Sequence, residues 1–147
     1  MDKRLKSLYQ SVILEHNKSP LNFEKKEAAS YQLKAYNSMC GDKYQLYFDV
    51  VEDRITNVYF HGYGCAISKA ATSILTKHLD QKTFEEAQQI CHLYLKHLQT
   101  DVLSEEEMIE EFEAFSAAQH FPGRAQCASL SWVETLGFLE ERLKSES

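Results

Sequence analysis

The sequence predicts an α+β domain in which helices pack on a small three-stranded antiparallel sheet. Three observations support this class. The chain opens with apolar residues at helical spacing, continues with three short stretches in which apolar and polar residues alternate, and returns to helical spacing from residue 66 onward. Since no repeat, linker or low-complexity stretch interrupts the 147 residues, we expect residues 1–147 to form a single domain.

The first half of the chain is expected to supply one helix and the whole sheet. The helix covers residues 2–17 and ends before Pro20, because proline lacks a backbone donor and biases the residue before it away from helix. The three strands are expected at residues 31–36, 45–50 and 55–60. Alternation in the second strand directs Leu46 inward and Tyr47 outward. The short connection at residues 52–54 indicates that the second and third strands form a hairpin.

The second half is expected to be helical. One helix begins at or just after Cys65, where two glycines precede the change of period. Two sequences of the capping-box form, at residues 83–86 and 104–107, each predict a helix start, and the second of these helices is expected over residues 103–118. The acidic run at residues 105–111 is interpreted as a solvated helix face. The last helix places Trp132 in the core.

The composition argues against several classes of function. The chain has 22 acidic and 16 basic residues and a formal net charge of −6, so its surface would repel the phosphates of a nucleic acid. No stretch approaches the ~18 consecutive apolar residues that a membrane span needs. Residues 1–4 lead directly into the first helix, without the apolar segment of a signal peptide. We therefore expect a cytoplasmic protein that binds neither nucleic acid nor membrane.

Four cysteines are the candidate chemical groups. In a reducing compartment they are thiols or metal ligands rather than disulfides. Cys91 lies on the apolar face of its helix and is interpreted as a core residue. Cys40, Cys65 and Cys127 instead fall at the ends of elements, and Cys65 opens a helix, where the helix dipole favours a thiolate. Cys127 is expected near the start of the last helix, off its main apolar stripe.

The spacing of these last three cysteines leaves two interpretations open. No C-x-x-C pair of the zinc-ribbon kind is present, so the three are either unrelated or brought together by the fold. If they converge, three thiolates and the carboxylate of Asp42 form a four-ligand set suited to Zn²⁺ or to iron in a cluster. Arg124 stands three residues before Cys127 and would share a helix face with its thiol; the alternative is a simple surface cation. The lack of an H-x-E and P-C-x-x-C pair argues against a zinc deaminase.

Three motifs surround these cysteines: Y-N-S-M-C-G-D at residues 36–42, F-H-G-Y-G-C-A-I-S at residues 60–68 and F-P-G-R-A-Q-C-A-S-L-S-W at residues 121–132. In this order they resemble the motifs of the iron–sulfur cluster scaffold family, the group of IscU, SufU and the N-terminal domain of NifU. The resemblance implies the SufE/NifU (IscU-like) fold. Ser38 departs from the family's usual proline, which would loosen the loop of Cys40, and Gln126 stands where IscU-type members carry histidine.

The missing histidine and the long segment before the third motif are similar to the SufU-type branch. That resemblance implies that Zn²⁺ is held by Cys40, Asp42, Cys65 and Cys127. It also implies that Cys40 accepts persulfide sulfur from a pyridoxal-phosphate (PLP) cysteine desulfurase of the SufS type, with Arg124 stabilising the freed thiolate or persulfide. The sulfur would pass to a downstream iron–sulfur scaffold or thiol acceptor, so the protein is expected to be a sulfur-transfer partner rather than a stand-alone enzyme.

Two alternatives to sulfur transfer stay open at this point. The first is a scaffold on which a [2Fe–2S] or [4Fe–4S] cluster is assembled on the same four ligands and passed on. The second is a non-catalytic interaction domain whose zinc only stabilises the fold. Four metal-binding positions serve any of these roles.

Overall fold

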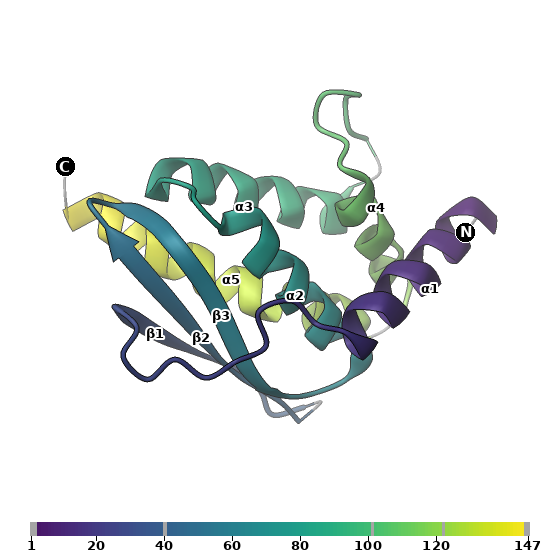
Figure 1. Ribbon diagram of the computed structural model, residues 1–147. Helices are drawn as coiled ribbons and strands as arrows, with labels where there is room; N and C mark the ends of the chain where they lie inside the picture. The colour runs from purple at the N-terminus through teal and green to yellow at the C-terminus, as the bar shows by residue number, and fades with distance from the viewer. Residues whose placement is uncertain (1–2, 40, 101, 122, 146–147) are drawn as a thin grey trace.

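Helices cover one face of a three-stranded sheet in the computed structural model of this protein (Figure 1). The structure describes residues 3–39, 41–100, 102–121 and 123–145. In chain order the elements are α1 (Lys3–Lys18), β1 (Tyr31–Asn37), β2 (Asp42–Val51), β3 (Arg54–Tyr63), α2 (Ala66–Leu79), α3 (Phe84–Gln99), α4 (Glu110–Ser116), η1 (Ala117–His120) and α5 (Arg124–Ser145). This arrangement confirms the predicted fold class. Within the described ranges, no helix has the length and apolar character needed to cross a membrane.

The sheet has the strand order β1-β2-β3, and both pairings are antiparallel. Leu46 in the central strand lies opposite Leu33 of β1 and Phe60 of β3. Glu52 and Asp53 form the turn between β2 and β3, with φ angles of 50° and 60°. Positive φ at both central positions matches the twist of the two strands, so the turn joins them tightly. The predicted hairpin is confirmed.

The core lies between the sheet and the helices that cover it. The ring of Trp132 on α5 stacks on Tyr94 of α3 at 4.0 Å between centroids, and its indole N–H donates to the Ala71 carbonyl at 3.0 Å. Phe112 of α4 packs edge-on against both rings. Cys91 is fully buried in this core, as predicted. Burial raises the pKa of its thiol, which therefore stays protonated.

The helix predicted from the second capping box is shorter than expected. The reciprocal hydrogen bonds between Ser104 and Glu107 form, at 3.1 and 3.2 Å, but they close a single turn. Ile109 then adopts an extended backbone, and its N–H donates to Nε2 of His97 on α3 at 3.2 Å. Because this N–H bonds to a side chain instead of a carbonyl one turn earlier, a continuous helix is interrupted here and α4 begins only at the next residue.

Tyr47 points away from the helices as predicted, yet it is buried, with 5% of its surface exposed. The connection between α1 and β1 explains the difference. It first runs along β3, where the Glu24 N–H donates to the Phe60 carbonyl at 2.8 Å. It then has to reach β1 at the opposite edge of the sheet, and its Glu27 comes near enough to Tyr47 to raise the pKa of the phenol in addition to the larger effect of burial. The alternation of apolar and polar residues in a strand does not show whether another segment of the chain covers its outer face.

The acidic run before and within α4 is not simply a solvated face. Glu107 forms an ion pair with a lysine of α3. Glu111 accepts hydrogen bonds from Lys77 Nζ at 2.8 Å and from His78 Nε2 at 2.9 Å, both on α2. The other carboxylate oxygen of Glu111 lies 3.4 Å from Nε2 of His16 on α1. The predicted solvated face is therefore wrong for these two carboxylates, which join α4 and the turn before it to neighbouring helices.

Candidate metal centre

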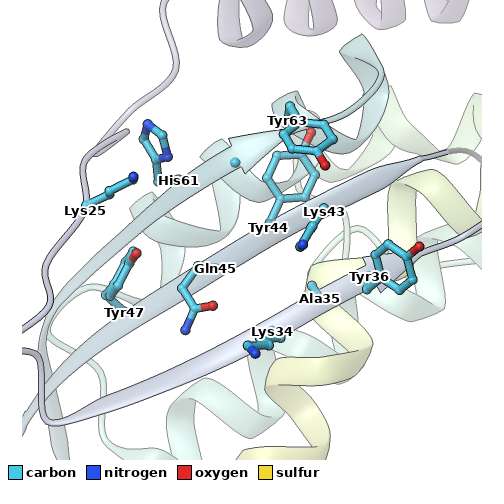
Figure 2. Close-up of a pocket in the computed structure, with 11 residues that line it drawn as sticks. Lys25, Lys34, Ala35, Tyr36, Lys43, Tyr44, Gln45, Tyr47, His61 and Tyr63 are labelled. Atoms are coloured by element: carbon cyan, nitrogen blue, oxygen red, sulfur yellow. The ribbon is translucent and has the colours of Figure 1, made fainter.

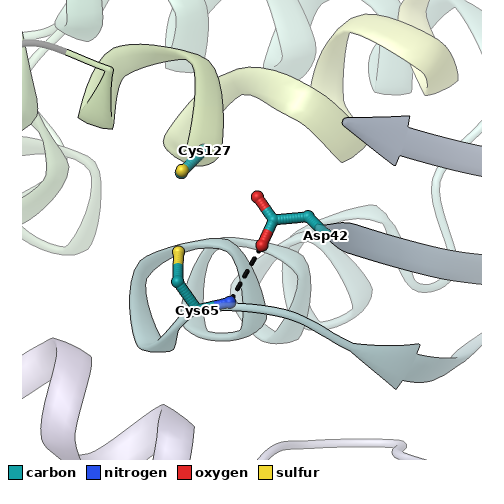
Figure 3. A group of neighbouring side chains, drawn as sticks. All are labelled: Asp42, Cys65 and Cys127. Carbon is teal, nitrogen blue, oxygen red and sulfur yellow. Dashed lines mark hydrogen bonds between the residues drawn. The ribbon is translucent and has the colours of Figure 1, made fainter. Parts of the chain in front are cut away.

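The fold brings together three of the four residues predicted as metal ligands. The ligand atoms of Asp42, Cys65 and Cys127 all lie within 4.8 Å of one another (Figure 3). Asp42 begins β2, Cys65 is the N-cap of α2, and Cys127 lies in the first turn of α5. The fourth predicted ligand, Cys40, falls between β1 and β2 in the sequence and lies outside the described residues.

Cys65 occupies the position where the backbone changes from extended to helical. Its Sγ accepts a hydrogen bond from the N–H of Ser68 at 3.4 Å, which is the bond of an N-cap side chain. The unpaired N–H groups at the start of α2 therefore face this partly buried side chain. The predicted position of Cys65 at a helix start is confirmed.

The carboxylate of Asp42 is fully buried and only one of its oxygens is satisfied. Oδ1 accepts hydrogen bonds from the Cys65 N–H at 2.9 Å (dashed in Figure 3) and from Ser68 Oγ at 3.0 Å. Oδ2 is buried and has no hydrogen-bond partner among the residues that the structure describes. A buried carboxylate oxygen without a partner is costly unless it meets a cation. Oδ2 is therefore the oxygen available to a metal.

Ser68 and Tyr44 hold this carboxylate in place, and neither was predicted as a site residue. The Tyr44 hydroxyl lies 2.9 Å from Ser68 Oγ. Burial raises the pKa of Tyr44 well above its usual value, so its phenol stays protonated. The hydroxyl can therefore donate a hydrogen bond to Ser68. Ser68 can then direct its own hydrogen to Asp42 Oδ1. The signal for Ser68 was its spacing, because the third residue after an N-cap faces the capping side chain.

Gly64 leaves open the space in which these groups meet. A Cβ atom at this position would lie 2.7 Å from Ser68 Oγ and closer still to the Tyr44 hydroxyl and the Asp42 carboxylate. Atoms in a protein do not approach one another so closely without a shift. Any side chain at residue 64 would therefore displace the carboxylate or its supports.

Cys127 is 1% exposed, although it was predicted to lie off the apolar stripe of its helix. Its burial does not conflict with that prediction, because α5 packs against several neighbours, among them α2, α3 and β1, and its buried surface is wider than one stripe. A helix enclosed on more than one side buries residues that a single-stripe pattern leaves out. The burial places the sulfur of Cys127 inside the molecule, facing Asp42 and Cys65 (Figure 3).

Arg124 begins α5 and is exposed. This exposure agrees with the alternative interpretation of Arg124 as a simple surface cation. Its charge nevertheless acts on Tyr9 of α1, a residue that was not predicted as part of the site. Burial raises the pKa of Tyr9, Arg124 opposes the rise, and Cys65 and Cys127 add to it. The ring of Tyr9 also stacks on Phe121 at 6.2 Å. The phenol of Tyr9 on α1 is thus within electrostatic reach of both cysteines and of Arg124.

A cation that prefers thiolates fits this donor set. Two cysteine sulfurs and one carboxylate oxygen supply three of the four donors of a tetrahedral Zn²⁺ site, and the same set extended by another cysteine suits iron as well. Two features of such a site are already in place: the Oδ2 of Asp42, which no described residue satisfies, and the position without a side chain at Gly64.

The fold and the centre together define a class: small α+β proteins with a thiol and carboxylate centre between a strand start and two helix starts. The chain matches the model of the NifU-like N-terminal domain over residues 8–128, and it belongs to that family. It is 30% identical over 128 residues to the zinc-dependent sulfurtransferase SufU of Bacillus subtilis (strain 168), covering 87% of this chain and 86% of that protein. It is 29% identical over 129 residues to the iron-sulfur cluster assembly scaffold protein IscU of Streptococcus pyogenes serotype M1, covering 88% of this chain and 80% of that protein.

Solved structures share the fold. A putative iron-sulfur cluster assembly scaffold protein for the SUF system from Fervidobacterium islandicum AW-1 matches with a TM-score of 0.79 at 27% identity, over 88% of this chain and 94% of that chain. The N-terminal part of a NifU-like protein from Brucella abortus matches with a TM-score of 0.78 at 12% identity, over 97% and 99% of the two chains, which supports the fold alone. The predicted family and the predicted IscU-like fold are confirmed. This is a member of a family of iron–sulfur cluster assembly proteins.

Proposed function

We propose that this protein accepts sulfur from a PLP-dependent cysteine desulfurase and passes it on for iron–sulfur cluster assembly, as a member of the SufU-type branch of its family. Cys40 is the sulfur acceptor, and one Zn²⁺ has the ligands Cys40, Asp42, Cys65 and Cys127. The observation that carries the proposal is the approach of two sulfurs to a buried carboxylate, one oxygen of which lacks a partner among the described residues. The name of the Bacillus subtilis relative, a zinc-dependent sulfurtransferase, supports the same activity.

The sulfur step is a displacement at sulfur. The Cys40 thiolate attacks the outer sulfur of a persulfide carried by the desulfurase cysteine. A new S–S bond forms on Cys40, the S–S bond of the donor breaks, and the donor cysteine leaves as a thiolate. The exchange conserves electrons, as thiol–disulfide exchange does, so no oxidant is required.

The neighbouring residues prepare that thiolate. When bound, Zn²⁺ would supply the positive charge that keeps the cysteines deprotonated at neutral pH. The carboxylate of Asp42 is a harder ligand than a thiolate and makes the more exchangeable position in the set. Arg124, exposed at the start of α5, would offset the charge of a freed thiolate or of the persulfide. The protein then acts as a partner of the desulfurase rather than as a stand-alone enzyme.

The test is sulfide release by the desulfurase in the presence of cysteine and a reductant. We expect wild-type protein to increase the rate and Cys40→Ala to abolish the increase, because the sulfur then has no acceptor. Cys91→Ala is the matched control, since that thiol is buried in the core, and it should behave as wild type. Stimulation by Cys40→Ala at the wild-type rate would refute the proposal.

The alternatives make different predictions for the purified protein. A cluster scaffold, which the similarity to the Streptococcus pyogenes IscU favours, would be brown and contain iron and sulfide. A sulfur acceptor would be colourless with about one zinc ion per chain. A zinc-stabilised interaction domain would lose the same stability in Cys40→Ala as in Cys65→Ala and would leave desulfurase turnover unchanged.

A further inference from the structure

The outer face of the sheet, away from the helices, carries a groove of about 640 Å³ that the metal centre does not use (Figure 2). Lys25, Lys34 and Lys43 bring three positive charges to it. Tyr36 and Tyr63, also in its lining, are 62% and 66% exposed. We call these five residues, with the groove between them, the lysine–tyrosine face.

The charge of this face is opposite to that of the molecule. The whole chain has a net charge of −6, with acidic residues outnumbering basic ones. Among the lining residues that the structure describes, three are lysines and none carries a carboxylate. Two carboxylates outside the lining act on its phenols: Glu27 adds to the effect of burial in raising the pKa of Tyr47, and Asp42 adds to it for Tyr44. A basic face selects an acidic partner by charge complementarity, and the same face on a second copy of this chain would be repelled.

The face also has the mixed chemistry of a protein-binding surface. Tyrosines are enriched in such surfaces because one ring buries a large apolar area while its hydroxyl stays hydrated. Lys43 lies between the rings of Tyr36 and Tyr63, and Lys34 and Lys25 lie farther along the same face (Figure 2). Such a groove fits a segment with an apolar side chain flanked by carboxylates better than it fits an isolated anion.

One end of the face reaches the strand ends that hold the metal centre. Lys43 directly follows Asp42 and lies opposite Tyr63 on β3 and Tyr36 on β1. Tyr63 stands two residues before Cys65, and Tyr36 four residues before Cys40. A protein that delivers sulfur to Cys40 therefore has to approach this end of the sheet.

We infer that the lysine–tyrosine face binds an acidic segment of the sulfur donor, a stretch with two or more carboxylates beside an apolar side chain. The inference rests on the proposed function, because it names the surface by which the desulfurase is held. The lysines pair with the carboxylates, and the exposed tyrosines pack on the apolar side chain. The acceptor loop between β1 and β2 then lies at the edge of the docked donor.

The experiment is a titration of the desulfurase against wild-type protein and two charge-reversal variants. Lys34→Glu with Lys43→Glu should weaken binding about tenfold or more, since two attractions become repulsions. Lys25→Glu with Lys34→Glu avoids the neighbour of Asp42 and should also weaken it. The matched control, Lys6→Glu with Lys18→Glu, makes the same change of net charge at exposed positions of α1 and should bind as wild type. Wild-type binding should weaken as ionic strength rises, and less so for the face variants.

The outcomes separate this inference from the proposed function. Unchanged affinity in both face variants, or an equal loss in the control, overturns the docking surface even if Cys40 still accepts sulfur. Normal docking by wild-type protein without Cys40-dependent sulfide release refutes the sulfur-transfer proposal and leaves the surface supported. A desulfurase that does not bind wild-type protein refutes both. Binding of a labelled single-stranded oligonucleotide, lost in the face variants, would identify nucleic acid as the occupant and overturn the inference.

Discussion

Ser68 orients the Asp42 carboxylate in the candidate metal centre. Its hydroxyl donates to Oδ1, which also accepts the Cys65 N–H, so both hydrogen bonds fall on the same oxygen. Oδ2 is thereby left for a ligand bond. Groups that hold a ligand from outside the metal's own shell fix its orientation and tune its affinity. The hydroxyl of Ser68 is therefore expected to affect metal affinity, although Ser68 is distant from Asp42 in the sequence.

Ser68→Ala is expected to lower the affinity for Zn²⁺ by about 10- to 100-fold, the usual effect of removing such a supporting group. Competition against a chromogenic chelator measures it. Ser131→Ala is the matched control, because Ser131 is another buried serine whose hydroxyl lies 2.6 Å from Thr72 Oγ1. Equal zinc affinities in the two variants would show that Ser68 does not orient the ligand.

At the scale of elements, α4 is joined to the fold by charge. Glu111 lies between α1 and α2, where it contacts His16, His78 and Lys77. Hydrogen bonds from His16, His78 and Lys77 hold the pKa of Glu111 well below its usual range, against the opposing effect of burial. A helix of seven residues has little stability of its own, so these contacts and the packing of Phe112 hold it.

Glu111→Gln is expected to lower the free energy of unfolding by about 1–3 kcal/mol at pH 7, because it removes hydrogen bonds to a charged group. The folded-state pKa of Glu111 is depressed, so its stabilisation is present above the unfolded pKa and is lost as the pH falls below about 4. The stability difference between wild type and variant should therefore shrink in acid. Urea denaturation of the metal-free proteins at pH 7 and below about pH 4 measures this difference.

The control for this prediction is Glu110→Gln, the exposed neighbour on the same helix turn. It removes the same charge without the contacts to α1 and α2. A Glu111 variant with the stability of this control, or with a deficit that stays constant into acid, would contradict the role assigned to the carboxylate.

The helices and strands followed from periodicity, and the errors fell where a distant group intervened. The capping box at Ser104 formed as predicted. However, the Ile109 N–H donates to His97 on α3, and the helix begins only after that residue. Tyr47 alternated outward as predicted, but a crossing connection covered it. Glu111 had the pattern of a solvated residue, and its partners belong to other helices. None of these contacts can be predicted from the local pattern of apolar and polar residues.

At the scale of the molecule, the candidate metal centre depends on three starts of elements meeting at one point. Asp42 comes from a strand, and Cys65 and Cys127 come from two helices that enter from different sides (Figure 3). Their residue types and their places at element ends were readable in the sequence, as was the family resemblance. Their convergence is a property of the packing of α2 and α5 on the sheet, which spacing alone does not contain.

X-ray absorption at the zinc edge of the purified protein tests the proposed ligand set most directly. We predict three sulfur neighbours at about 2.3 Å and one oxygen neighbour at about 2.0–2.2 Å. Asp42→Ala should remove the protein's oxygen ligand and keep the three sulfurs. A spectrum with four sulfur neighbours, or with only nitrogen and oxygen neighbours, would contradict a centre made by Cys40, Asp42, Cys65 and Cys127.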